Sequence, residues 1–167
     1  MFNFKFIIVS CCILLFIVSV YELSLANTRN NSLHSYIKSV STTNVSDTEI
    51  QRIIAATKKT KHPEMILAII QQESTFNPRA KSRTGAKGLG QITSVHHKDL
   101  MKKGIIKSKS DIWIIENNVR AIEHVYDSYL KQSKGNVSRA LGRYYGAASN
   151  RYVNSVMRNY NKLKGRK

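Results

Sequence analysis

The chain contains almost no cysteine. Its only two cysteines, Cys11 and Cys12, lie side by side in an apolar N-terminal run, and none follows them. The rest of the chain therefore has no disulfide and no thiolate metal site, and we expect packing alone to stabilise its fold. His96 and His97 do not indicate a metal site either, because neighbouring residues of a helix point about 100° apart and no carboxylates gather with them. We expect both histidines at the surface, and neither a metal nor a cofactor.

Long apolar runs are also lacking. The longest, Phe6–Val20, is shorter than the roughly 20 apolar residues that cross a bilayer as a helix. Lys5 before it and Ser24-Leu25-Ala26 after it are typical of a secretory signal with its cleavage site. We therefore predict a signal peptide over residues 1–26 and a mature protein in the periplasm or secreted. An uncleaved segment would instead anchor the chain in the inner membrane.

Acidic residues are scarce as well. The chain has 10 Asp and Glu residues against 27 Lys and Arg, a net charge of +17, and no acidic residue follows Asp127. Such a positive field attracts polyanions, although an alternative is that the charge only keeps the protein soluble. Nucleic acid is not expected as a partner, because the chain has no zinc or single-strand-binding signature and begins with an export signal. Anionic envelope polymers are the expected partners.

The remaining residues predict one mostly helical domain. Residues 27–45, rich in Asn, Ser and Thr, predict a polar linker, and residues 46–167 form a single domain without repeats. Turn residues over 76–90 predict a loop or a small β-hairpin, so the fold class is α+β, predominantly α-helical with at most a short β-hairpin. Six helices are predicted. The first follows the capping box Ser46–Glu49, the second runs from Pro63 to Glu73, and the third lies around Val95 and Leu100. The fourth begins at Ser110 or Asp111 with Trp113 in the core, the fifth spans 137–145 behind Asn136, and the last lies around Tyr152.

Glu73 is the candidate catalytic residue. It shares a helix face with Ile66, Ile69 and Ile70, so its carboxyl group points toward the core. Burial disfavours the charged form and raises the pKa of a carboxyl group, which can then donate a proton near neutral pH. The alternative is a partly exposed Glu at a frayed helix end, capped by Ser74 or Asn77. We expect desolvation to prevail over the surrounding positive charge, provided that no Lys or Arg reaches the carboxyl group directly.

Several blocks of sequence resemble one known family. Glu73-Ser74, Phe76-Asn77-Pro78 and Gly85-Ala86-x-Gly88-Leu89-x-Gln91-Ile92 are similar to the signature of lytic transglycosylases with a goose-lysozyme-like domain. Asp111-Ile112-Trp113, Asn118-Val119, Ala140-Leu141-x-x-Tyr144 and Tyr152-Val153-x-x-Val156 continue the likeness, which covers roughly Glu49 to Leu163. Three positions depart from the family pattern, with Gly90 in place of Met, Tyr145 in place of Asn and Ile122 in place of Gly.

The resemblance implies a lysozyme-like fold and an enzyme that cuts the bacterial cell-wall glycan. By this likeness Glu73 is the catalytic acid, Ser82 and Gln91 hydrogen-bond near the acid and the substrate, and the Tyr144 hydroxyl orients the carboxyl group. Tyr145 is the best candidate for a sugar contact, whereas Tyr152 is expected only to pack. The implied partners are peptidoglycan glycan strands, with components of a secretion system or pilus as a further possibility, and the protein is expected to be monomeric.

The scarcity of carboxylates near Glu73 bears on the reaction. Ordinary glycosidases use two carboxyl groups, and no other acidic residue lies between Glu73 and Asp99. The reaction that the resemblance implies needs only one: it cleaves the β-1,4 bond between N-acetylmuramic acid and N-acetylglucosamine and leaves a 1,6-anhydromuramyl end. Two alternatives stay open, namely a lysozyme-like muramidase that uses water and a non-enzymatic, basic envelope-binding module.

Overall fold

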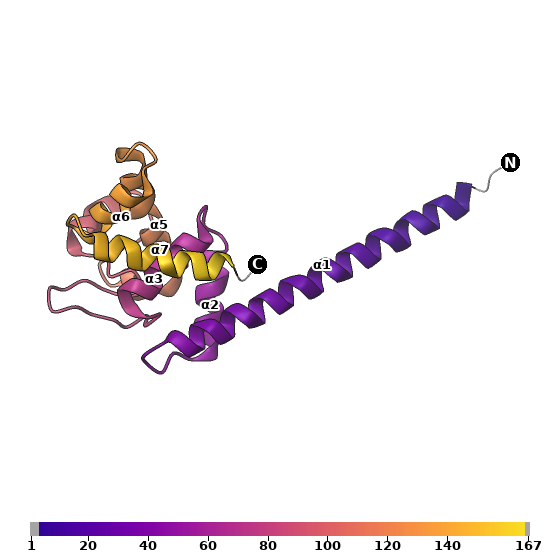
Figure 1. The fold of residues 1–167 in the computed structure, drawn as a ribbon, viewed down its shortest axis with the longest axis horizontal. Helices are drawn as coiled ribbons and strands as arrows, with labels where there is room; N and C mark the ends of the chain where they lie inside the picture. The colour runs from indigo at the N-terminus through magenta and orange to yellow at the C-terminus, as the bar shows by residue number, and fades with distance from the viewer. Residues whose placement is uncertain (1–3, 166–167) are drawn as a thin grey trace.

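The computed structural model describes the backbone of residues 4–165 and the side chains of residues 17–165. Lys5, Cys11 and Cys12 of the predicted signal peptide lie outside the described side chains. The described elements are α1 (Phe4–Val40), α2 (Asp47–Thr57), α3 (Pro63–Ser74), η1 (Ser94–His96), α4 (His97–Lys102), η2 (Asp111–Trp113), α5 (Ile115–Gln132), α6 (Val137–Tyr145) and α7 (Asn150–Lys164). α1 extends as a long arm from a compact body that the other helices form (Figure 1).

The predicted small hairpin is present only as isolated bridges. Lys87 pairs with Lys81 on one side and with Ile92 on the other, and no regular strand forms among residues 4–165. Positive φ angles at Gly85 and Gly88 turn the chain between the paired positions. The fold class is therefore confirmed as predominantly α-helical.

α2 begins as the sequence predicts. The Ser46 side chain accepts a hydrogen bond from the backbone N–H of Glu49, and the Glu49 carboxylate accepts one from the backbone N–H of Ser46. This reciprocal capping satisfies two donors that a helix start otherwise leaves free, and it contributes about 1 kcal/mol. It places Ile50 and Ile53 on the face that is fully buried.

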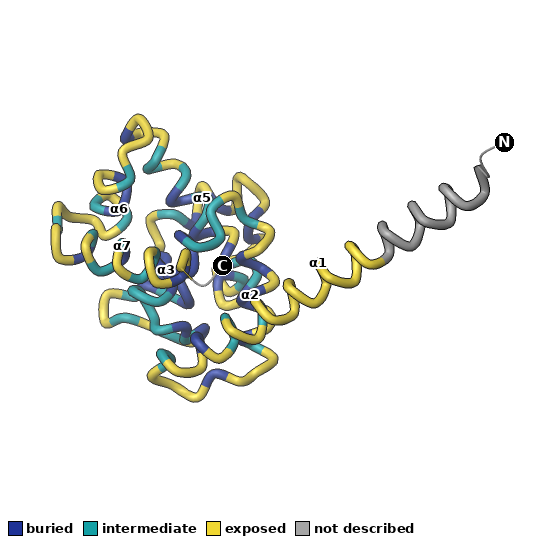
Figure 2. The backbone as a smooth tube through the Cα atoms, turned by 45° about the vertical axis from the view of Figure 1, so that its right-hand side comes forward, coloured by how far each residue is buried: buried dark blue, intermediate teal, exposed yellow. Residues whose placement is uncertain are grey.

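α3 is the central helix of the body. Pro63 occupies its first turn, and the run Met65–Ile70 is buried throughout. The helix packs against α7 and contacts α2 and α5 as well, and Figure 2 shows the buried residues in the interior of this body. Each fully buried isoleucine of this run contributes roughly 1.5–3 kcal/mol of transfer free energy. The end of α3, where Glu73 lies, is thus fixed by the best-packed part of the fold.

The segment 27–45 differs from the expected polar linker. α1 continues through it to Val40, and Tyr36 and Ile37 are buried in the body. The Tyr36 hydroxyl donates a hydrogen bond of 2.9 Å to the Gln71 side chain, and Lys38 forms an ion pair with Asp47. The apolar residues Leu33, Tyr36, Ile37 and Val40 recur at helical spacing, and this stripe explains the packing.

The predicted domain boundaries at residues 26, 45 and 46 stay predictions. Over the residues with described placement, no helix combines the length and the apolar character that crossing a membrane requires.

Three further expectations about single residues are wrong. His97 is buried, because it shares the inward face of α4 with Leu100 three residues later. Val95 is 78% exposed on the short turn η1, which interrupts the single helix expected around Val95 and Leu100. Trp113 is 36% exposed at the end of η2, and an extended residue, Ile114, separates this turn from α5.

Candidate active site

The chain turns sharply directly after Glu73. α3 ends at Ser74, and both Thr75 and Phe76 have positive φ, at 48° and 65°. This conformation is unfavourable for residues with a β-carbon. The Phe76 side chain is completely buried, and its burial holds the strained turn in place. The helix therefore ends directly after Glu73, and the carboxyl group of Glu73 lies at the rim of the core.

The environment of Glu73 has two opposing influences on its pKa. The side chain is half-buried, and this burial raises the pKa above its usual value. The Tyr152 hydroxyl donates a hydrogen bond of 2.5 Å to Oε1, which favours the carboxylate and lowers the pKa. Burial is the larger of the two, so the pKa of Glu73 is raised. None of the ion pairs among the described residues involves Glu73, so no neighbouring cation stabilises its charged form by direct contact.

Tyr152, and not Tyr144, is the hydroxyl donor to Glu73. Tyr152 is buried on α7, and burial followed by the negative charge of Glu73 raises its own pKa, so the phenol stays protonated. The Tyr144 hydroxyl instead donates a hydrogen bond of 2.9 Å to the backbone carbonyl of Gly90. The Tyr144 hydroxyl therefore does not donate to Glu73 in this structure, because the Gly90 carbonyl accepts its hydrogen. A contact of Tyr144 with substrate stays a prediction. Tyr152 was expected only to pack, and its spacing in the sequence carries no signal for this contact.

Tyr145 lies beside this pair. Its ring stacks on that of Tyr152, with the ring centroids 4.6 Å apart and the planes 22° from parallel. The side chain remains 53% exposed. An exposed aromatic face next to the carboxyl group suits contact with a sugar ring, and this role stays a prediction.

Ser82 and Gln91 hold the loop between α3 and η1. The Ser82 hydroxyl accepts a hydrogen bond of 3.0 Å from the backbone N–H of Ala86. The Gln91 side chain donates to the carbonyl groups of Ala80 and Gly88, at 3.1 and 3.0 Å. Both residues therefore satisfy backbone groups of the loop, and a direct contact of either with substrate stays a prediction.

Asn118, at the start of α5, fastens the same loop to the body. Its side-chain oxygen accepts from the backbone N–H of Gly90 at 3.0 Å, and its nitrogen donates to the carbonyls of Lys87 and Ile112. It is buried, so each of these bonds protects a backbone group that would otherwise lose its partner. The sequence places Asn118 in a family block but does not reveal this positioning role. A β-carbon at Gly88 would lie 2.3 Å from the Asn118 side-chain nitrogen, so the loop can approach this close only with glycine there.

Gly90 and Ile122 form a matched pair across the same contact. A β-carbon built at Gly90 would lie 2.2 Å from Cγ1 of Ile122 and 2.8 Å from the Tyr144 hydroxyl. Ile122 is fully buried on α5. Its side chain therefore occupies the space that any larger residue at position 90 would need, and two of the three departures from the family pattern are complementary in volume.

The other acidic side chains of the body are engaged elsewhere. Each one is bonded to a cation, a histidine or a backbone N–H away from Glu73: Glu49 to Arg79, Glu64 to Arg29, Asp47 to Lys38, Asp99 to His124, Asp111 to Ser108, Glu116 to Arg52, and both Glu123 and Asp127 to Lys61. In the part of the chain that the structure describes, no three or more His, Cys, Asp and Glu side chains gather as a metal site would require. The site thus offers the chemistry of a single carboxyl group with a phenol donor.

Comparison with known proteins identifies related folds. Residues 51–166 match the family model described as Transglycosylase SLT domain. The fold is similar to the 70 kDa soluble lytic transglycosylase from Escherichia coli, with 22% identity, a TM-score of 0.50, and coverage of 68% of this chain and 19% of that one. It is also similar to an inactive Glu-to-Gln mutant of a lytic transglycosylase from Pseudomonas aeruginosa, with 20% identity, a TM-score of 0.51, and coverage of 69% of this chain and 21% of that one. The chain spans about a fifth of the length of these proteins, and at this identity the likeness shows the fold.

Proposed function

Because this chain belongs to the Transglycosylase SLT domain family, which residues 51–166 match, we propose that it is a peptidoglycan lytic transglycosylase. The observation that supports this most is the half-buried carboxyl group of Glu73, with a raised pKa and a hydrogen bond from Tyr152. Both solved structures compared above are lytic transglycosylases. The substrate is the β-1,4 bond between N-acetylmuramic acid and N-acetylglucosamine.

Glu73 acts first as the acid. With its pKa raised by burial, the protonated carboxyl group donates its proton to the glycosidic oxygen as the C1–O bond breaks. The muramyl C1 becomes positively charged, and the acetamido group of the same sugar stabilises it. Substrate assistance of this kind removes the need for a second carboxylate, which matches the engagement of the other described acids elsewhere.

Glu73 then acts as the base. Its carboxylate takes the proton from the muramyl C6 hydroxyl, whose oxygen bonds to C1 and closes the 1,6-anhydro ring. The proton lost in the first step is thereby recovered, and no water is consumed. The Tyr152 hydroxyl stabilises the carboxylate between the two steps, because its hydrogen bond favours the charged form. Ser82, Gln91, Tyr144 and Tyr145 are proposed as the residues that bind the glycan.

The mass of the released fragments distinguishes this reaction from hydrolysis. Purified protein with intact wall glycan should release fragments whose muramyl ends are lighter by one water than reducing ends. Fragments with reducing ends would instead identify the lysozyme-like muramidase. The variant Glu73→Gln keeps the size of the side chain but cannot transfer a proton, so it should release neither product. Unchanged wall clearance by this variant would reject both enzymatic hypotheses in favour of the envelope-binding module.

The proposed location follows from the substrate. Peptidoglycan lies outside the cytoplasmic membrane, so the enzyme must be exported to reach it, to the periplasm or beyond. The proposed signal peptide over residues 1–26 would supply this export.

A further inference from the structure

A cavity borders the candidate active site. It has a volume of about 440 Å³, and its lining includes Gln72, Tyr145, Arg151, Tyr152, Ser155 and Arg158. Two of these residues connect it directly to the reaction site. Tyr152 donates its hydroxyl to Glu73, and Tyr145 stacks on Tyr152. A ligand group in this cavity would therefore lie next to a sugar bound at Glu73.

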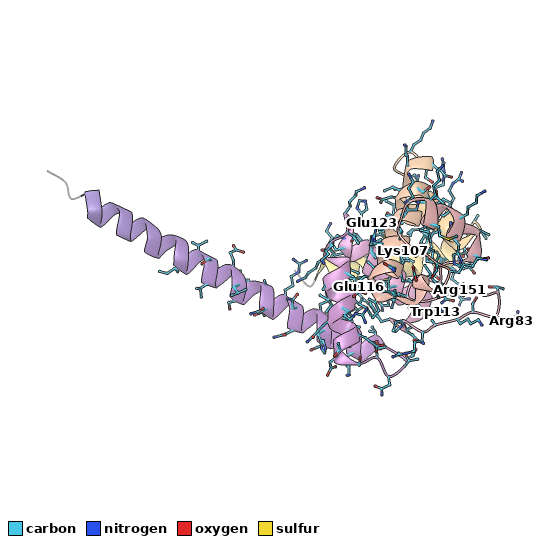
Figure 3. All side chains as sticks on the ribbon, turned by 180° about the vertical axis from the view of Figure 1, so that it is seen from behind. Arg83, Lys107, Trp113, Glu116, Glu123 and Arg151 are labelled. Atoms are coloured by element: carbon cyan, nitrogen blue, oxygen red, sulfur yellow. The ribbon has the colours of Figure 1, made fainter. Side chains whose placement is uncertain are left out.

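The cavity is positively charged and contains no acidic residue. Arg151 and Arg158 are seven residues apart on α7, so both lie on one face of this helix, roughly 10 Å apart along its axis. Both side chains are exposed, and neither forms a hydrogen bond or ion pair with another described residue. By contrast, Arg29, Arg52 and Arg79 each form an ion pair with a glutamate. Figure 3 places Arg151 toward the end of the body away from α1, where the loop with Arg83 also extends.

The remaining polar groups of the cavity hold its shape. The Ser155 hydroxyl donates to the Gln72 side chain, the neighbour of Glu73 in the sequence. This bond links α7 to the end of α3 beside the reacting carboxyl group. The two guanidinium groups thus project from a helix whose position relative to Glu73 is fixed.

We propose that Arg151 and Arg158 form a subsite for a carboxylate of the peptide that each muramic acid carries. The inference rests on the proposed function and extends it to the peptide part of the substrate. Guanidinium groups bind carboxylates through paired, charge-assisted hydrogen bonds. The glycan itself is uncharged at these positions, so the peptide is the part of the substrate that supplies anions. The guanidinium groups would bind a separate phosphate-rich envelope polymer through the same kind of hydrogen bond, but such a polymer is not attached to the sugar at Glu73.

Binding of a soluble disaccharide-peptide tests the subsite without any cleavage. N-acetylglucosaminyl-N-acetylmuramyl-peptide with free carboxylates is compared with the same molecule after amidation, by titration calorimetry. The wild-type protein should bind the amidated form roughly tenfold more weakly, since charge-assisted hydrogen bonds are lost. In the double variant Arg151→Gln/Arg158→Gln this difference should shrink to less than about twofold. The affinity for the disaccharide whose lactyl group ends in a neutral amide in place of the peptide should stay unchanged.

A matched control removes the same charge elsewhere. Lys98 and Lys102 are exposed on α4, and Lys98→Gln/Lys102→Gln should keep the full preference for free carboxylates. Equal affinity of the wild-type protein for both forms would overturn the subsite, as would an arginine variant that still discriminates. An arginine variant that loses affinity only for a sugar-free phosphate polymer would also overturn it. Mass analysis of the cleavage of peptide-free glycan strands tests the proposed reaction separately, so the failure of one is distinguishable from the failure of the other.

Discussion

The carboxyl group of Glu73 is set by two neighbours with opposite effects. Burial disfavours its charge, and the Tyr152 hydroxyl favours it. An acid that must first give and then regain a proton benefits from this balance, because a pKa near the working pH serves both steps. A buried carboxyl group without a donor would give its proton less readily, and one with several donors would hardly carry a proton at all.

Replacing Tyr152 by Phe removes the donor and leaves the ring. The pKa of Glu73 should then rise further, since the influence that lowers it is lost. Activity requires the protonated acid, so the rate falls as pH rises through this pKa. The alkaline limb of the kcat/KM profile should therefore move to higher pH. The maximum should fall by roughly tenfold or more, because a hydrogen bond to a charged group contributes about 1.5–3 kcal/mol.

The neighbouring tyrosine provides the control for this shift. Tyr145→Phe keeps the stacked ring and removes a hydroxyl that does not contact Glu73. Its alkaline limb should stay where it is in the wild-type profile, whatever its effect on the rate. A Tyr152→Phe limb that moves to lower pH, or does not move, would contradict the assigned role.

Gly90 and Ile122 should be energetically coupled. Gly90→Ala places a β-carbon against Ile122 and should destabilise the fold by about 1–3 kcal/mol, as overpacking of a core does. In an Ile122→Ala background the same change should cost much less, because the atoms that it meets at 2.2 and 2.6 Å are gone. Urea unfolding of the two single variants and the double variant measures the coupling. Strictly additive free energies would show that the two positions do not share this space.

At the scale of elements, the loop between α3 and η1 has almost no regular structure, yet many of its polar groups are bonded. Gln91 and Ser82 bond it internally, and Asn118 ties it to α5. Because these bonds come from side chains, the loop is positioned without a β-sheet. This explains how a segment with turn chemistry can approach the core as closely as Gly88 approaches Asn118.

The final turns of α1 should contribute to the stability of the body. Ile37 is completely buried, and Ile37→Ala should lower the free energy of unfolding by about 2–5 kcal/mol through lost burial and the cavity that remains. Ser35→Ala, at an exposed position in the same helix, is the control and should have almost no effect. If residues 27–45 were a disordered tether, both substitutions would be silent in urea unfolding.

At the scale of the whole molecule, the ion pairs use the few acids and leave a large excess of cations. Arg52–Glu116, Lys61–Asp127 and Arg79–Glu49 join elements far apart in the sequence. Figure 3 shows Glu116 and Glu123 on the side of the body nearer α1, with Arg151 and Arg83 toward the opposite side. Exposed pairs of this kind contribute about 0–1 kcal/mol each, so the charge distribution bears mainly on association.

Association with the cell wall should depend strongly on salt. With a net charge of +17, binding to walls rich in anionic polymer should weaken roughly tenfold as the ionic strength rises from about 50 to 200 mM, since screening shortens the reach of the positive field. Cleavage of short, peptide-free glycan fragments should change far less. Co-sedimentation with walls and fragment turnover, measured over the same salt series, separate the two effects. Equal salt dependence of both would contradict a role of the net charge in wall association.

Several local elements of this protein are determined by the sequence itself. The capping box of α2, the proline start of α3 and the Asn136 cap of α6 depend on hydrogen bonds and sterics within three or four residues, which the order of side chains already specifies. The apolar face that carries Glu73 follows in the same way from helical periodicity. The family blocks add the identity of the candidate acid, because their order and spacing are present in the sequence alone.

The partners of those elements were decided only by the tertiary structure. Tyr152 reaches Glu73 across 79 residues, Gly90 meets Ile122, and Tyr36 and Ile37 bring α1 into the core. Two adjacent tyrosine-bearing helices offer hydroxyl groups that are equivalent in sequence, and only packing selects which one meets the carboxyl group. Such choices depend on distances between segments far apart in the chain, and no local pattern of residues encodes those distances.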